Sequence, residues 1–159
     1  MPPTNLLHSK TVLSKHFLIS RGLTVLLVDE NYLYAEEGES LMRAFRKMNS
    51  SQFFWCKTDS LLKDPTATEI YTCKSAYDDF ERGYLKYEDG IQFWDRLLFD
   101  INSDNYVIHT AYAHLLYAGK PAFIDEIRVS SEPHIINGWL RVVGKRFEDP
   151  DLKAAYDLP

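Results

Sequence analysis

The hydrophobic pattern along the chain alternates between short apolar runs and longer stretches of mixed polarity. In residues 23–28, five of the six side chains are apolar, and the run lacks the period-two alternation of a half-exposed strand. This pattern favours a strand that is covered on both faces. Two further runs, residues 52–57 and 121–124, predict strands of the same kind.

Between these runs, apolar residues recur every three or four positions, which is the spacing of an amphipathic helix. A lead-in helix is predicted over residues 9–20, and Gly22 stands where it would end. The clearest stripe covers residues 70–87 and is opened by Asp64 and Pro65. The same spacing or capping signals predict helices over residues 41–48, 94–101, 103–116 and 131–143, and from 149 onward.

Strands that alternate with helices are typical of an α/β fold, so we predict a small, mainly parallel sheet flanked by helices. The expected organisation is one domain: a lead-in helix in residues 1–22, an α/β core in 23–129 and C-terminal helices in 130–159. An alternative is a turn at residues 29–31 that closes a hairpin between 24–28 and 32–35. That would give an α+β fold with a small hairpin sheet packed on helices.

The composition limits the classes of function that the chain can have. With 45% hydrophobic and 14% aromatic residues, the 159-residue chain has the composition of a globular protein. Its net charge of −5 excludes a general attraction to nucleic acid or anionic membranes. The chain has no apolar run near the ~20 residues that span a bilayer and no signal-peptide pattern, so we expect a cytoplasmic protein. Cys56 and Cys73 are predicted to be buried free thiols.

Four acidic residues are the candidate catalytic groups, because each falls at the end of a predicted strand or the start of a predicted helix. In a parallel sheet these positions can meet at one edge. Carboxylates that converge need a counter-charge, and Mg²⁺ or Mn²⁺ suits oxygen ligands. Helix caps and turns explain the same positions equally well. The candidates are Asp29, Glu69, Asp104 and Asp125.

The segments around these acids resemble the motifs of PIN-domain ribonucleases over residues 23–129. The matching pieces are Val-Asp-Glu-Asn at 28–31, Thr-Glu-Ile at 68–70, Ile-His-Thr-Ala-Tyr-Ala at 108–113 and Phe-Ile-Asp at 123–125. The resemblance implies Mg²⁺-dependent hydrolysis of RNA by a metal-bound water. It makes Asp29, Glu69 and Asp125 the metal ligands. We expect an antitoxin or a toxin as protein partner.

Either of two adjacent residues can occupy the third acidic position of the family motif. Asp104 would bind the metal or orient a water, but strict alignment of the isoleucine-histidine pair puts Asn105 there instead. His109 and His114 are five residues apart and face different directions on a helix or a strand, so they make a poor metal pair.

A second function class is a small acidic binding protein, of the immunity or antitoxin type, that covers a basic site on another protein. The charge of −5 would steer it toward such a partner, and exposed aromatic side chains would anchor it. A hairpin topology with scattered acids favours this hypothesis, whereas a parallel sheet with clustered acids favours the nuclease. The oligomeric state is open at this level.

Overall fold

A computed structural model of the chain describes residues 2–100 and 104–159. Within these ranges the strands are β1 (Leu7–Ser9), β2 (Val12–Leu13), β3 (Thr24–Val28), β4 (Gln52–Lys57), β5 (Tyr71–Lys74), β6 (Arg96–Phe99), β7 (Tyr106–His109), β8 (Leu115–Gly119), β9 (His134–Asn137) and β10 (Leu140–Val143). The helices are α1 (Lys15–Ser20), α2 (Glu36–Lys47), α3 (Thr58–Lys63), α4 (Tyr77–Phe80), the π-helical turn η1 (Glu81–Leu85), the 3₁₀ turn η2 (Ile91–Phe93), α5 (Pro121–Glu126) and α6 (Pro150–Tyr156).

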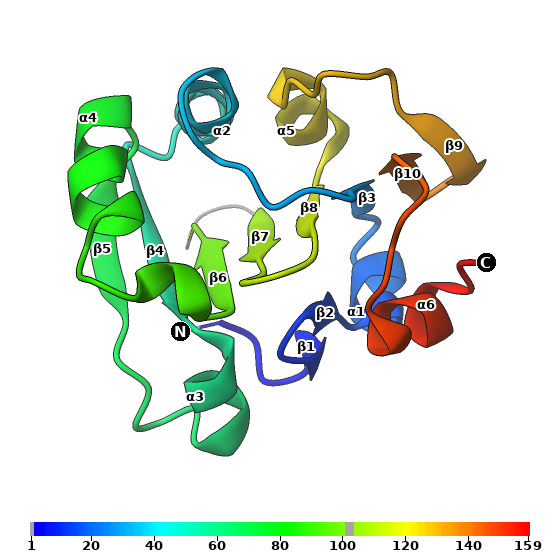
Figure 1. Cartoon of the computed structure of the whole chain (residues 1–159), viewed down its shortest axis with the longest axis horizontal. Helices are drawn as coiled ribbons and strands as arrows, with labels where there is room; N and C mark the ends of the chain where they lie inside the picture. The colour runs from blue at the N-terminus through cyan, green and yellow to red at the C-terminus, as the bar shows by residue number, and fades with distance from the viewer. Residues whose placement is uncertain (1, 101–103) are drawn as a thin grey trace.

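One large sheet organises the described part of the chain (Figure 1). Its eight strands follow the order β5-β4-β6-β7-β8-β3-β10-β9, while β1 and β2 form a separate ribbon. Among the described strands of the main sheet, β3 and β10 are the one parallel pair, and every other pair of neighbours is antiparallel. Chain-neighbouring strands such as β6, β7 and β8 pair directly, as hairpins do.

The register brings several loops together at one end of the main sheet, which we call the loop end. Val28, His109 and Val143 are the last residues of β3, β7 and β10, and they lie in one row with Arg96 and Leu115, the first residues of β6 and β8. The loops that follow or precede these residues therefore meet at the same end of the sheet.

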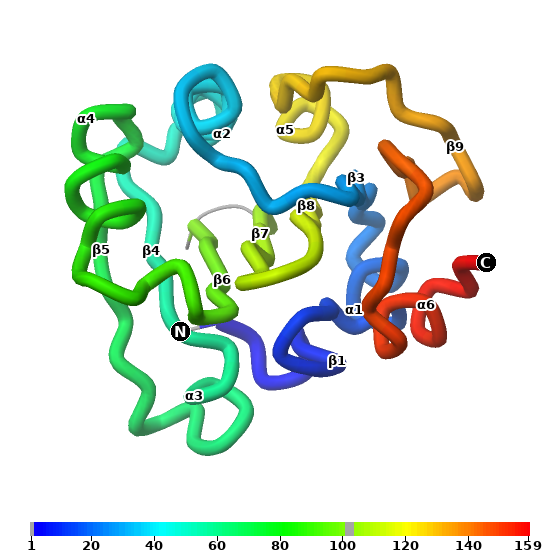
Figure 2. Tube along the Cα trace, viewed as in Figure 1, coloured from blue at the N-terminus to red at the C-terminus, as the bar shows by residue number. Residues whose placement is uncertain are grey.

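Helices cover both faces of the main sheet (Figure 1). One face packs against α2, α4 and α5, and its apolar cluster includes Phe45, Phe53 and Phe123. The other face packs against α1, α3, α6 and the β1–β2 ribbon, with Phe17 and Tyr156 in its cluster. Figure 2 shows the first residues (blue) and the last helix (red) on the same side of the sheet.

The predicted mainly parallel, PIN-like sheet is wrong. Of the seven pairs of neighbouring strands described in the main sheet, only β3–β10 is parallel. The fold is α+β. The alternative hairpin is not formed either: β3 pairs with β8 and β10, and residues 32–35 form no strand.

Three predicted helices are strands in the structure, and for β6, β7 and β8 the reason is burial on both faces. Residues 94–101 contain β6, residues 103–116 contain β7 and the start of β8, and residues 131–143 contain the β9–β10 hairpin. Every residue of β6, β7 and β8 is buried. A strand that is apolar on both faces loses its period-two signal and can imitate a helical stripe. The predicted boundary at 101–103 lies outside the described residues.

Other predicted helices and strands differ from the structure in their type or their bounds. The predicted helix over 70–87 divides into β5, α4 and η1, although Phe80 and Tyr84 are buried as expected. The predicted strand at 121–124 is α5, which Pro121 opens at a position where helices accept proline. The lead-in region 1–22 holds β1, β2 and a shorter helix, and 130–159 holds β9 and β10 as well as α6.

Predictions that depended on local signals are confirmed. Strands β3 and β4 and helix α6 lie where the pattern placed them, and Asp149 caps α6. Helix α2 is also formed, but it begins at Glu36 rather than at Leu41. Cys56 and Cys73 are buried free thiols. No helix in residues 2–100 and 104–159 combines the length and the apolar character that crossing a membrane requires.

Candidate functional site

Asp29 lies at the loop end, directly after β3, where its carboxylate closes a turn. Its Oδ2 accepts hydrogen bonds from the backbone amides of Lys145 (2.8 Å) and Arg146 (3.2 Å), just after β10. Gly144 adopts a φ of +91°, and a Cβ there would overlap the Asp29 carboxylate. This acid therefore fastens the chain after β10 to the end of β3.

The other three candidate acids lie elsewhere. Glu69 precedes β5 and accepts a hydrogen bond from the Tyr71 hydroxyl. Because β5 is five strand spacings from β3, it is about 24 Å away across the sheet. Asp104 precedes β7 and pairs with Arg21 at the end opposite the loop end.

Asp125 lies in α5, where it forms an exposed ion pair with Arg141 of β10 at 3.2 Å. Asn105, the alternative to Asp104, is buried and donates to Asp100. The structure thus brings none of the four acids together. Within residues 2–100 and 104–159, no group of three or more histidine, cysteine, aspartate or glutamate side chains could hold a metal ion.

The loop end instead gathers exposed aromatic side chains. Tyr112, at the turn between β7 and β8, is 79% exposed, and its ring lies 6.3 Å from that of Phe93, which is 60% exposed in η2. Tyr32 and Tyr34, in the loop after β3, are also exposed, and their rings are 5.4 Å apart. Exposed aromatic residues on neighbouring loops are typical of interaction surfaces.

The turn that carries Tyr112 is held rigidly. The Thr110 hydroxyl accepts hydrogen bonds from the amides of Ala113 (3.1 Å) and His114 (2.7 Å) and donates to the His114 carbonyl (2.8 Å). From outside the turn, the Asn31 side chain donates to the carbonyls of Thr110 and Ala111. The position of the turn is therefore determined by the loop after β3.

His114 lies beneath this turn and is 1% exposed. Its Nε2 is 2.9 Å from the carbonyl oxygen of Thr11, so this nitrogen donates and Nδ1 is left with a lone pair. Nδ1 is buried and has no hydrogen-bond partner among the described residues. Burial lowers the pKa of His114 below its usual value, so the ring is neutral at pH 7.

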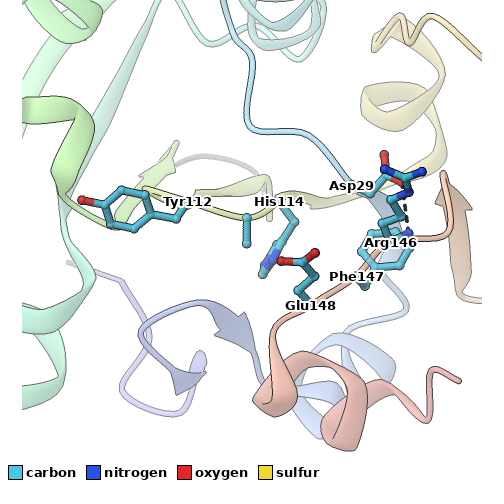
Figure 3. A pocket seen from close by; sticks show the side chains of 7 residues that line it. Asp29, Tyr112, His114, Arg146, Phe147 and Glu148 are labelled. Atoms are coloured by element: carbon cyan, nitrogen blue, oxygen red, sulfur yellow. Dashed lines mark hydrogen bonds between the residues drawn. The ribbon is translucent and has the colours of Figure 1, made fainter.

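A small cavity of about 200 Å³ opens beside His114 (Figure 3). Tyr112 lines one end, Asp29 and Arg146 line the other, and His114 and Glu148 lie between them in this view. Glu148 is exposed, and no cationic group among the described residues lies within 4 Å of its carboxylate. We call this cavity the His114 pocket.

The chemistry of the His114 pocket is that of a site for hydrogen-bond donors. Glu148 offers a carboxylate, which accepts hydrogen bonds, and the neutral His114 ring lines the same cavity. The Tyr112 ring points away from His114 and Glu148 and lies near Phe93 at the rim of the pocket (Figure 3). A guanidinium or ammonium group provides donors and a positive charge together, so it fits the Glu148 carboxylate.

The sequence pattern singled out His114 only as a possible metal ligand, and it gave no signal for Glu148. The two lie 34 positions apart in the sequence, and neither has a motif around it. The expectation that His109 and His114 face different ways does fit the structure: His109 contacts Tyr84 on one face of the sheet, and His114 contacts Thr11 on the other. Comparison of the chain with family models, with characterised proteins and with solved structures finds no match.

Proposed function

We propose that this protein is a binding protein whose loop end covers a basic segment of another protein, with one arginine or lysine side chain in the His114 pocket. The observation that carries the proposal is the unpaired Glu148 carboxylate, which lines the same cavity as the neutral His114 ring. A cationic donor from a partner would give this carboxylate a charge-assisted hydrogen bond.

The net charge and the exposed aromatic side chains support a basic protein as the partner. The net charge of −5 favours encounter with a cationic surface. Glu30, Glu88 and Asp89 are exposed in the loops that carry the aromatic residues or lead into them. Tyr112 and Phe93 provide the kind of aromatic anchors that dominate binding energy at protein interfaces.

RNA hydrolysis through bound Mg²⁺ or Mn²⁺ would need carboxylates that converge on the ion. The four candidate acids lie in different parts of the fold, so this function has less support than binding. Antiparallel hairpins with scattered acids are the arrangement expected of a binding protein of the immunity or antitoxin type.

The test uses N-acetyl-arginine amide as the probe, followed by NMR chemical-shift changes of backbone amides. We expect saturable shifts at residues 112–114 and 146–148. Glu148→Gln should weaken binding about tenfold, because a hydrogen bond to a charged group contributes about 1.5–3 kcal/mol.

Two controls separate recognition of a cation from general effects. N-acetyl-citrulline amide has nearly the same shape without the charge, so it should not bind. Glu132→Gln changes an exposed acid outside the pocket and should leave the affinity for arginine amide unchanged. Equal binding of the two amides, or an unaltered affinity in Glu148→Gln, would disprove the proposed function.

A further inference from the structure

The main sheet has an open edge at β9. Among the described residues, β9 pairs with β10 on one side and has no strand on the other. Its two isoleucines are solvent-exposed, Ile135 at 70% and Ile136 at 47%. An edge strand presents unpaired N–H and C=O groups, so an extended strand is the natural occupant of this edge.

The opposite edge, β5, is protected in ways that β9 is not. Lys74 is an exposed charge within β5, and the Tyr71 ring stacks on Trp55 at 4.3 Å and contacts Tyr87 at 4.9 Å. Strand β9 has the sequence His-Ile-Ile-Asn, without lysine, acid or proline. Charges and coverage are the usual means by which proteins prevent edge pairing. The sheet therefore has one unprotected edge.

We propose that β9 pairs with β9 of a second copy of this chain, so that a two-fold axis joins the two main sheets into one continuous sheet. Identical strands pair antiparallel around such an axis, and we place the axis at Ile135, so that Ile135 lies directly opposite Ile135 of the other copy. The strand has no charged residue, so two identical strands do not repel each other. Because β5 is protected, association stops at a dimer.

An apolar hollow of about 310 Å³ extends the same surface on the other face of β9. Ile136, Val142, Phe147 and Leu158 line it together with His134. In the paired arrangement, Ile136 lies opposite His134 of the second copy, beside this hollow. The dimer therefore covers apolar surface on both faces of the edge, in addition to pairing the backbone groups.

The first experiment measures the oligomeric state by sedimentation equilibrium over a wide range of protein concentration. The wild type should be a reversible dimer, and Ile135→Lys should weaken the dimer at least about tenfold, because it puts a charge on the edge. Thr72→Lys makes the same kind of change on β5 and should leave the dimer unchanged. A monomeric wild type, or equal dimerisation of Ile135→Lys, would overturn the proposal.

The second experiment tests the register. Directly opposite residues of an antiparallel pair have Cα atoms about 4.5–5.5 Å apart, which allows a disulfide. Mild oxidation should therefore convert Ile135→Cys into a covalent dimer. Ile19→Cys, at a 50% exposed site in α1, should stay monomeric on a denaturing gel, and the native Cys56 and Cys73 are buried. Equal cross-linking of both variants would contradict β9 pairing.

Discussion

At the scale of single residues, Asp29 shows how one carboxylate can be structural while its sequence context suggests catalysis. It follows an apolar strand, as catalytic acids of α/β enzymes do. In the structure, its oxygen is occupied by the amides of Lys145 and Arg146, so it acts as the cap of a turn. Gly144 leaves the space that this carboxylate needs.

This role predicts that Asp29→Ala destabilises the protein by about 0.5–2 kcal/mol, the range found when a capping side chain is removed. Urea unfolding measures the loss. Asp59→Ala is the control, because Asp59 forms only an exposed ion pair with Lys63 and should contribute less than about 0.5 kcal/mol. A cluster of mutually repelling carboxylates predicts the reverse, namely that removing the Asp29 charge stabilises the fold.

At the scale of the elements, the end of β7 is joined to η1 and to the loop after β3 through His109. Its Nε2 donates to the Asn31 carbonyl at 2.7 Å, and its Nδ1 accepts from the Tyr84 hydroxyl at 2.8 Å. Burial and the neighbouring Arg96 guanidinium lower the pKa of His109 to about 3. The folded protein therefore keeps this ring neutral in mildly acidic solution.

The lowered pKa of His109 predicts a loss of stability in acid. Below about pH 6.5 the unfolded chain binds a proton at this residue that the folded chain does not bind. The free energy of unfolding therefore decreases as the pH is lowered. The fall approaches about 1.4 kcal/mol per pH unit and continues until the folded-state pKa is reached.

The measurement is the free energy of unfolding as a function of pH between about 6.5 and 4. His109→Gln should show a smaller slope than the wild type, whatever its stability at pH 7. His16→Gln changes an exposed histidine of α1 and should leave the slope nearly unchanged. If His109→Gln keeps the slope of the wild type, the ring is protonated in the folded state at these pH values.

At the scale of the whole molecule, the two ends of the described chain hold each other in place. Tyr156, in α6, is buried, and its hydroxyl donates to the Leu13 carbonyl at 2.8 Å. Its ring contacts Trp139, and Lys15 pairs with Asp157 nearby. The last helix thus closes one apolar cluster over the first strands (Figure 2).

We expect Tyr156→Phe to cost about 1–3 kcal/mol, because the buried Leu13 carbonyl loses its donor. Tyr156→Ala should cost about 3–5 kcal/mol, as other large-to-small core substitutions do. Urea unfolding gives both values, and Tyr112→Phe is the matched control, since the Tyr112 ring is 79% exposed. A wild-type stability for Tyr156→Phe would mean that water replaces this hydrogen bond.

Elements whose signals are local could be predicted from the sequence. The apolar runs of β3 and β4 and the Asp149-Pro150 start of α6 need no information from distant residues, because capping and β-branched runs act within one turn or strand. Burial of Cys56, Phe80 and Tyr84 followed in the same way from their apolar patterns.

The tertiary structure alone decided strand direction, pairing and the candidate site. Strands β6, β7 and β8 are apolar on both faces because helices cover both sides of the sheet, and this coverage removes the alternation that identifies a strand. Strands β3 and β7 run in the same direction, and Asp29 follows β3 whereas Asp104 precedes β7, so the two acids lie at opposite ends of the sheet. The His114 pocket joins residues 112–114 to 146–148 because Asp29 fastens the chain after β10 beside the turn after β7.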